Sequence, residues 1–397
     1  MKVAMIGLGK LGMPCGEAMA QKHEVMGYDV SPVESKSIQV KSSIKEAIDG
    51  TEIIFIAVPT PHDEKYDGRS QISDLPPKDF DYAIVKEVLG EITQHANKDQ
   101  DIVLISTVLP GTVRREFAQI VDGFTFIYNP YFIAMGTVAE DFMAPEFFIL
   151  GERDGDTKKM ERVINFYNTV VPNLNTRLGT WEEAECVKIF YNTFISFKLS
   201  FVNMIQDVSM SIGHINVDFV TDSLCLGNKR ILSPMYMKAG MGDGGPCHPR
   251  DNIALRDLAA RLDLGYDLYS SIMESREAQA KNLARYLLKF NKPIVILGKS
   301  FKPGVPFTDG SYSLLIGHYI EKQGGSVNYW DFLIDDCKFE TKEAGTYLLG
   351  HMDDRFHSHS FAKGSTIIDP WRRCPDIEGC EVIHYGDTRQ VNPDQLM

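Results

Sequence analysis

The chain has 397 residues, of which 44% are hydrophobic and 24% charged, and its formal net charge at pH 7 is −13. This composition is typical of a globular protein, and the length predicts two or three domains with a sizeable core. The acidic balance argues against nucleic acid or an anionic membrane as a partner, because both require a basic surface.

Cysteine usage and apolar runs indicate the compartment. The cysteines, at positions 15, 186, 225, 247, 337, 374 and 380, do not have the paired spacing of a metal site. Free thiols fit a reducing cytosol. The apolar start, MKVAMIGLG, is too short and glycine-rich for a signal peptide, and no later run reaches about 18 apolar residues. We expect a cytoplasmic protein with no metal site and no membrane segment.

The first thirty residues predict a βαβ unit. Lys2 to Ile6 is a buried-strand pattern, and a second such run, Glu24 to Tyr28, ends at Asp29. Between the two runs stand three glycines at GxGxxG spacing, Gly7, Gly9 and Gly12. A helical pattern follows the glycines, and the acid comes about twenty residues after the first of them. At that spacing a carboxylate meets a ribose 2′-hydroxyl.

Each glycine of this motif has its own expected role. Gly7 makes the tight turn, Gly9 lets the backbone approach a pyrophosphate, and Gly12 packs the helix on the strand. The helix N-terminus faces the negative charge. A carboxylate at Asp29 would repel a 2′-phosphate, so NAD is favoured over NADP.

Three further strands are predicted within Thr51–Pro61, Asp101–Thr107 and Phe124–Pro130, and all fit a parallel sheet whose carboxyl ends form the ligand edge. The segment between Pro61 and Pro77 is rich in Asp, Gly, Ser and Pro and is expected to be a surface loop. After Gly151 the pattern changes to helices.

A long helix is predicted from Trp181 to about Met210. Lys188 and Asn192 are four residues apart in it and so lie on one face. Without context, the pair would be interpreted as a surface lysine beside an amide. Ala259 to Lys289 also has helical periodicity.

A second α/β pattern fills the last hundred residues, which predicts a C-terminal Rossmann-like domain. Its expected strands lie within Pro293–Gly298, Ser326–Asp331, Ser365–Asp369 and Glu381–Gly386, with a helix from about Leu314 to Gln323. His351, His357 and His359 could suggest a metal cluster, but no cysteine or carboxylate stands at ligand spacing around them, which favours a polar loop.

Met241 to Asp251, MGDGGPCHPRD, places Cys247 behind three glycines and between two prolines. Glycines let such a loop approach a ligand closely, and prolines stiffen it. We therefore expect the thiol to be presented to solvent, with Arg250 beside it and a helix after Asp251. A thiolate is a strong nucleophile, and cations and helix N-termini favour that form. A turn that merely contains a small apolar residue is the alternative.

Several stretches together resemble the UDP-glucose/GDP-mannose dehydrogenase family. They are GLGKLG, VPTP (58–61), STVLPGT (106–112), AECVKIFYN (184–192), KRI (229–231), GGPCHPRD (244–251) and LGKSFKPG (297–304). The resemblance implies an α/β fold with two Rossmann-like, doubly wound domains joined by a central helical dimerisation domain. The implied division is an NAD-binding domain at 1–178, a central domain at 179–290 and a nucleotide-sugar domain at 291–397.

What the family does is carried over here as an expectation. The resemblance implies oxidation of a nucleotide-diphosphosugar at C6 with two molecules of NAD, and a homodimer formed through the long helix. The implied catalytic residues are Cys247, Lys188, Asn192, Asp251 and Thr107. The implied cofactor contacts are Gly7, Gly9, Leu11, Gly12, Asp29, Pro59, Thr60, Ser106 and Thr107. The implied substrate contacts are Tyr131, Phe132, Lys188, Asn192, Arg230, Gly244 and Lys302.

The chemistry explains these residue types. An ammonium and an amide, Lys188 and Asn192, would hold the alkoxide that develops as hydride leaves C6. The Cys247 thiolate would attack the aldehyde, and the thiohemiacetal could give up a second hydride to become a thioester. Water near Asp251 would hydrolyse that thioester.

Two departures from the family pattern stand out. The family carries PEFLxEG, whereas PYFIAMG places Tyr131 and Met135 where acids are expected. A missing general base would slow the reaction by roughly 10²- to 10⁴-fold unless Asp251 compensates. The family's RES motif is also absent, with Asp309, Gly310 and Ser311 in its place. His248 in the cysteine loop is interpreted as a spacer.

The sequence thus predicts an NAD-dependent nucleotide-sugar 6-dehydrogenase with UDP-glucose as the default substrate. GDP-mannose and an N-acetylated UDP-hexosamine stay open. A two-electron enzyme resembling the β-hydroxyacid dehydrogenases, or a variant that stops at the aldehyde, is one alternative. A catalytically dead NAD- or nucleotide-sugar-binding protein is another.

Overall fold

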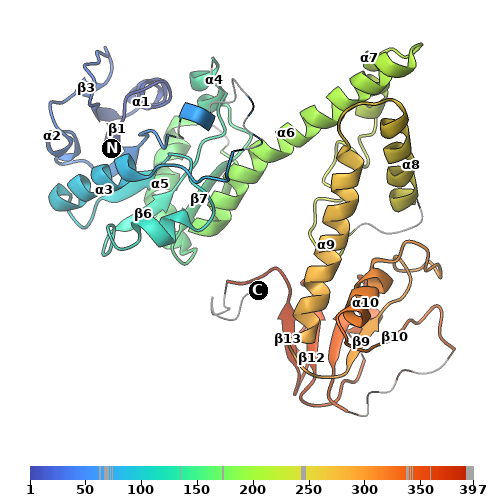
Figure 1. The fold of residues 1–397 in the computed structure, drawn as a ribbon. Helices are drawn as coiled ribbons and strands as arrows, with labels where there is room; N and C mark the ends of the chain where they lie inside the picture. Colours follow the sequence, from blue (N-terminus) through green and yellow to red (C-terminus); the bar gives the residue numbers. More distant parts are fainter. Residues whose placement is uncertain are drawn as a thin grey trace. The chain divides into compact units, whose positions relative to one another are not determined.

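The computed structural model describes residues 1–397 apart from 62, 63, 67–70, 72, 74, 135, 172, 173, 243–246, 337, 338, 340, 342, 358 and 390–397. Its contacts divide the chain into two compact units, Met1–Ser200 and Phe201–Met397 (Figure 1). The three-domain division predicted from the sequence stays a prediction.

The first unit is built on an eight-stranded sheet with the order β3-β2-β1-β4-β5-β6-β7-β8. All neighbouring strands are parallel except β6 and β7, which pair antiparallel. The strands are β1 (Lys2–Ile6), β2 (Glu24–Tyr28), β3 (Gln39–Val40), β4 (Ile53–Ile56), β5 (Asp101–Leu104), β6 (Thr125–Tyr128), β7 (Phe148–Glu152) and β8 (Thr176–Thr180). The strands predicted for the first 130 residues are confirmed, with tighter bounds.

Both faces of this sheet are covered. Its helices are α1 (Gly12–Ala20), α2 (Ile44–Ile48), α3 (Ala83–His95), α4 (Val138–Met143) and α5 (Thr157–Val170), with short 3-10 and π segments at Glu64–Tyr66 and Val113–Phe117. In β1, Val3 and Met5 join one buried cluster with α1, α4 and α5, while Ala4 and Ile6 join the other with α2 and α3. Burial on both faces explains why these strands are continuously apolar.

The expectation of helices alone after Gly151 is wrong at β8. Its sequence, TRLGT, has no apolar alternation, and none of its residues is fully buried at the edge of the sheet. It forms a strand because it pairs along its whole length with the fully buried β7. Pairing with a distant segment has overridden a weak local preference.

The predicted long helix is confirmed as α6 (Trp181–Ile212). It ends where Gly213 and His214 take positive φ angles of 77° and 58°. The amide of Gly213 donates to the carbonyl of Ser209, which closes the last turn.

The second unit carries a five-stranded parallel sheet with the order β10-β9-β11-β12-β13. Its strands are β9 (Ile294–Leu297), β10 (Val327–Trp330), β11 (Thr346–Leu349), β12 (Thr366–Asp369) and β13 (Glu381–His384). Its helices are α7 (Val217–Cys225), α8 (Cys247–Arg261), α9 (Leu268–Leu288) and α10 (Tyr312–Lys322), with a 3-10 turn at Asp354–Phe356. Helices α9 and α10 pack against one face of the sheet.

Two expectations for this unit need correction. Strand β11, at the centre of the sheet, was not predicted, because its sequence TYLL lacks the Val and Ile residues that mark β9 and β12 as strands. The helix expected over Ala259–Lys289 is broken between α8 and α9. Asp263 and Gly265 have φ angles of 51° and 76° there, which an α-helix cannot contain.

No helix in the described part of the chain combines the length and the apolar character needed to cross a membrane. The doubly wound α/β fold class expected from the sequence is confirmed for the two sheets.

Candidate active site

The turn between β1 and α1 needs glycine at two positions for steric reasons. Gly7 has a φ of 94°, and a Cβ there would lie 2.6 Å from the carbonyl oxygen of Ala57. A Cβ on Gly12 would overlap the carbonyl oxygen of Gly7. At Gly9, by contrast, no atom lies within 4 Å of such a Cβ, so this backbone faces open space. The three roles expected for these glycines therefore fit a cradle for a pyrophosphate.

Two other residues flank this cradle. The Asp29 carboxylate follows β2 and accepts from the amide of Leu8 at 2.7 Å and from that of Ser31 at 2.8 Å. These bonds fix the carboxylate beside the glycine turn and leave further lone pairs for ribose hydroxyls. Leu11 directly precedes α1 and packs against the core of the first unit.

The loops after β4 and β5 are tied to each other. The Ser106 hydroxyl donates to the carbonyl of Val58 at 2.5 Å, and the Thr60 hydroxyl donates to the carbonyl of Thr107 at 2.7 Å. Pro59, which lies between Val58 and Thr60 in the sequence, is exposed. These predicted cofactor residues thus lie together at the carboxyl edge of the sheet, where nucleotides bind in open α/β folds.

Lys188, on α6, is buried, and its Nζ donates to the carbonyl of Tyr131 at 2.7 Å. The same Nζ lies 5.2 Å from the centre of the Phe132 ring. Burial lowers the pKa of Lys188. Asn192 follows one helical turn later and is exposed. The structure therefore brings the Lys188 amine, the carbonyl of Tyr131 and the Phe132 ring together, and their contact with substrate stays a prediction.

The side chain of Tyr131 does not face this site. It is 5% exposed and lies in the core, where its hydroxyl is 2.7 Å from that of Tyr167. Tyr167 in turn donates to Asn129 Oδ1 at 2.6 Å. Only the carbonyl of Tyr131 remains for a role beside Lys188. Met135, the other position where an acid was expected, lies outside the described residues.

In the second unit, Cys247 is exposed and is the first residue of α8. The sequence predicted a loop here with a helix after Asp251, so the helix begins earlier than expected. Asp251 is one helical turn beyond Cys247, and it forms an ion pair with Arg250 at 2.9 Å. The Asp251 carboxylate raises the pKa of Arg250, and the Cys247 thiol contributes in the same direction. Gly244 lies outside the described residues.

Glycines also anchor the segment that leads to this helix, a feature the sequence analysis missed. A Cβ on Gly240 would overlap the ring of Trp371, and one on Gly242 would overlap the ring of Tyr312. The Arg372 guanidinium donates to the carbonyl of Ala239. The backbone of residues 239–242 is therefore held close against the aromatic side chains of the C-terminal α/β region.

The two basic residues predicted to contact substrate are both exposed. Arg230 lies in the turns after α7, and Lys302 forms a β-bridge with Val305 in the loop after β9. Ser311, where the RES motif is absent, instead caps α10 by accepting from the amide of Leu314.

The turn after β9 resembles the N-terminal one but is filled by the protein itself. Gly298 has a φ of 105°, and a Cβ there would lie 2.7 Å from the His351 ring. His351 lies in a bend after β11, as the polar-loop interpretation expected, but it is buried, with Nε2 3.0 Å from the Ser300 hydroxyl. Burial tends to raise the pKa of Asp331, but hydrogen bonds from His351 and Ser300 hold it well below its usual range.

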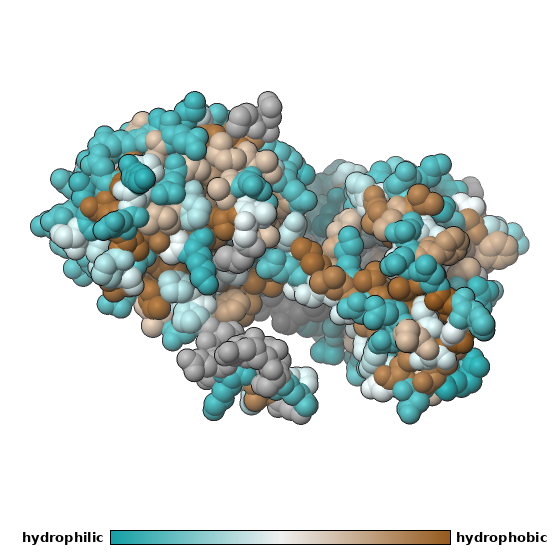
Figure 2. All heavy atoms as spheres, turned by 90° about the horizontal axis from the view of Figure 1, so that it is seen from above, coloured by the Kyte–Doolittle hydropathy of each residue, from teal (hydrophilic) through white to brown (hydrophobic). Residues whose placement is uncertain are grey.

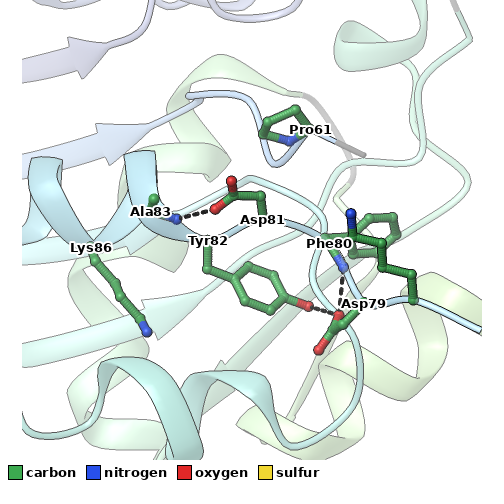
Figure 3. Close-up of a pocket in the computed structure, with 8 residues that line it drawn as sticks. Pro61, Asp79, Phe80, Asp81, Tyr82, Ala83 and Lys86 are labelled. Carbon is green, nitrogen blue, oxygen red and sulfur yellow. Dashed lines mark hydrogen bonds between the residues drawn. The ribbon is translucent and has the colours of Figure 1, made fainter. Parts of the chain in front are cut away.

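A cavity of about 580 Å³ opens beyond the loop after β4 (Figure 3). Its wall comes from Pro61 and from the residues around the start of α3, Lys78, Asp79, Phe80, Asp81, Tyr82, Ala83 and Lys86. The Tyr82 hydroxyl points at Asp79 and donates to it at 2.5 Å, and Asp81 accepts from the amide of Ala83. The sequence analysis expected only a surface loop before these residues.

Glu185 is a second feature that the sequence analysis missed. This carboxylate is fully buried on α6, and it accepts from the amides of Gly111 and Val113. The motif AECVKIFYN contains it, but nothing in the local pattern shows that residues more than seventy positions earlier supply its donors.

The glycine cradle, the carboxylate beside it and the parallel sheet define a dinucleotide-binding α/β protein. Family models agree: residues 30–171 match the NAD binding domain of the UDP-glucose/GDP-mannose dehydrogenase family, and residues 182–278 match its central domain. The chain belongs to this family of nucleotide-sugar dehydrogenases, and its cofactor is NAD.

Individual relatives cover nearly the whole chain. It is 26% identical to a GDP-mannose 6-dehydrogenase of Azotobacter vinelandii, over 93% of this chain and 96% of the relative. It is 25% identical to a UDP-glucose 6-dehydrogenase of Rhizobium meliloti, over 94% of this chain and 90% of the relative. Among solved structures, the fold is similar to that of a GDP-mannose dehydrogenase of Pseudomonas aeruginosa, with a TM-score of 0.81, 22% identity and coverage of 96% and 99%.

Proposed function

We propose that this protein oxidises the C6 hydroxymethyl group of a nucleotide-diphosphohexose to the carboxylate in two steps. The observation that carries the proposal is the hydrogen bond from the buried Lys188 amine to the carbonyl of Tyr131. A preorganised cation of this kind stabilises a developing alkoxide. NAD supplies a hydride acceptor for each step.

The chain's own residues would do the remaining chemistry. In the first oxidation, the Lys188 ammonium and the Asn192 amide hold the sugar oxygen as it loses its proton. The Cys247 sulfur then attacks the aldehyde carbon to form a thiohemiacetal, and loss of a second hydride and a proton gives the thioester. Water attacks the thioester carbon, and the sulfur leaves as thiol while the uronate forms.

Asp251 is our candidate for activating that water. It lies one turn from Cys247 on α8, and its carboxylate is exposed and hydrogen-bonded to Arg250. The Tyr131 side chain cannot serve in this role because it lies in the core. Thr107 remains a candidate catalytic residue at the edge of the sheet.

The nucleotide sugar itself is an open part of the proposal. UDP-glucose is the default of the sequence analysis, but relatives named for GDP-mannose and for UDP-glucose have nearly equal identity, 26% and 25%. Both compounds therefore head the list of candidate substrates, with an N-acetylated UDP-hexosamine third.

A substrate panel with purified protein and NAD tests this proposal. We expect one nucleotide sugar to give two NADH per sugar, read at 340 nm, and a uronate as the product. One NADH per sugar would instead support an enzyme that stops at the aldehyde. This is the leading alternative, because the Tyr131 side chain lies in the core and leaves no acid at that position of the site. NAD binding without turnover on any sugar would support a catalytically dead binding protein.

We also propose that the protein is a homodimer. Large apolar side chains are exposed along α6 and the segment after it, among them Phe190, Phe194, Phe219, Leu226, Ile231 and Met237. Figure 2 likewise shows hydrophobic side chains open to solvent among hydrophilic ones on the face it presents. A second copy of the chain would cover such residues. Light scattering should give about twice the chain mass of 44.6 kDa, and a monomeric mass at micromolar concentration would contradict the proposal.

We expect the protein to act in a reducing cytosol. The six cysteines in the described part of the chain are free thiols, which fits that compartment.

A further inference from the structure

Glu185 is a fully buried carboxylate whose oxygens are both occupied by backbone donors. Its exposed fraction is 0%. Oε2 accepts from the amide of Gly111 at 2.5 Å, and Oε1 accepts from the amide of Val113 at 2.7 Å. A buried charge is costly unless it is paired or hydrogen-bonded, so a carboxylate at this position needs a specific reason.

The segment that Glu185 holds is the loop after β5, which carries Ser106 and Thr107. The near end of this loop is tied to the loop after β4 through Ser106 and Thr60. Further along, the amide of Leu109 donates to the Tyr82 hydroxyl. At its far end, the loop passes into the π-helical turn Val113–Phe117, and Glu185 fastens that end to α6.

Lys188 lies one helical turn after Glu185 on the same helix. Residues three apart on an α-helix are neighbours on its surface, and the helix between them is rigid. Because Lys188 in turn binds the carbonyl of Tyr131, the edge of the sheet after β6 is joined to the same helix. Glu185 thus links the cofactor loop to the element that carries the amine.

We propose that Glu185 is a positioning residue, which keeps the loop of Ser106 and Thr107 at a constant distance from Lys188 and so aligns bound NAD with the group that holds the sugar oxygen. The part that concerns NAD depends only on the cofactor site, and the part that concerns the sugar rests on the proposed function.

Burial and the groups around this carboxylate set the pH at which it ionises. The charged and titratable side chains that interact with it come from α6, the π-helical turn and β6, and they are Glu182, Cys186, Arg114, Arg115 and Tyr128. Burial raises the pKa of Glu185 to about 7, against the opposing effect of the two backbone amides. The ionised form, which can accept from both amides, therefore becomes more populated as pH rises through neutrality.

The test compares Glu185→Gln with Glu182→Gln in the full chain. In Glu185→Gln the amide nitrogen of the new side chain meets one of the two backbone donors, so one buried N–H loses its acceptor. Glu182 is a matched control, because it lies on the same helical turn and reaches the same π-helical turn through an exposed ion pair with Arg114. We expect Glu185→Gln to bind NAD about tenfold more weakly by fluorescence titration. Glu182→Gln should bind it like the unsubstituted protein.

If Glu185 had a purely structural role, Glu185→Gln would lower the melting temperature, but NAD affinity and kcat measured below that temperature would not change. If Glu185→Gln is folded and matches Glu182→Gln in NAD affinity, the proposal is wrong, whatever substrate the enzyme uses. If Glu185→Gln does not fold, Glu185→Asp takes its place in the same comparison, because it keeps the carboxylate but shortens the side chain by one methylene and so alters the distance between the loop and α6. An unchanged NAD affinity of folded Glu185→Asp would overturn the proposal.

Discussion

Replacement of Cys247 by serine should abolish uronate formation while leaving NAD binding unchanged. A hydroxyl at the start of α8 is a far weaker nucleophile than a thiolate near neutral pH, so the thioester would not form. We expect the rate of uronate formation to fall by at least about 10³-fold, as is typical when a covalent nucleophile is removed. Any oxidation that persists should stop at the aldehyde, which a carbonyl-trapping reagent would detect.

The measurement follows NADH at 340 nm and the sugar product by chromatography, with NAD affinity determined separately. Cys225→Ser is a suitable control, because Cys225 is also exposed and ends a helix of the same unit. Uronate formation at a normal rate by Cys247→Ser would remove the thioester from the mechanism.

Replacement of Lys188 by methionine should lower kcat by roughly 10²- to 10³-fold, the loss typical of removing one donor to an oxyanion. Methionine keeps the length and apolar stem of the side chain but removes the ammonium that binds the carbonyl of Tyr131. Lys198→Met is the control, because Lys198 lies exposed on the same helix. Equal kcat values for the two variants would exclude Lys188 from the oxidation.

The pH dependence of the unsubstituted enzyme gives a second check on Lys188. Burial lowers the pKa of this amine, and the ammonium is the form that stabilises an alkoxide. We therefore expect kcat to fall as pH rises and Lys188 loses its proton. This fall should come at a lower pH than the pKa of an ordinary lysine would give. Lys188→Arg should move this alkaline limb upward, since arginine stays protonated.

The N-terminal βαβ unit and its glycine turn could be predicted from the sequence. Gly7, Gly12 and Asp29 act within one βαβ unit, so their spacing along the chain carries the geometry with it. The long helix α6 was likewise predictable, because helical periodicity is a property of neighbouring residues. The start of α8 at Cys247 was not, because the glycines and prolines around it favour a loop.

Other features depended on contacts between distant segments. The ring of Tyr131 lies in the core, where its hydroxyl is hydrogen-bonded to that of Tyr167, which itself donates to Asn129. The edge strand β8 exists because β7 pairs with it. Neither outcome leaves a periodic trace in the local sequence.

The amino-acid sequence by itself therefore determined the class of fold, the cofactor and the residue types of the candidate site. The tertiary structure decided which of those side chains face the site and what holds them in place, with Glu185 as the clearest case. The reason is physical: turns and helices are set by short-range sterics and hydrogen bonds, whereas the partner of a buried carboxylate is whichever backbone amide the fold brings to it.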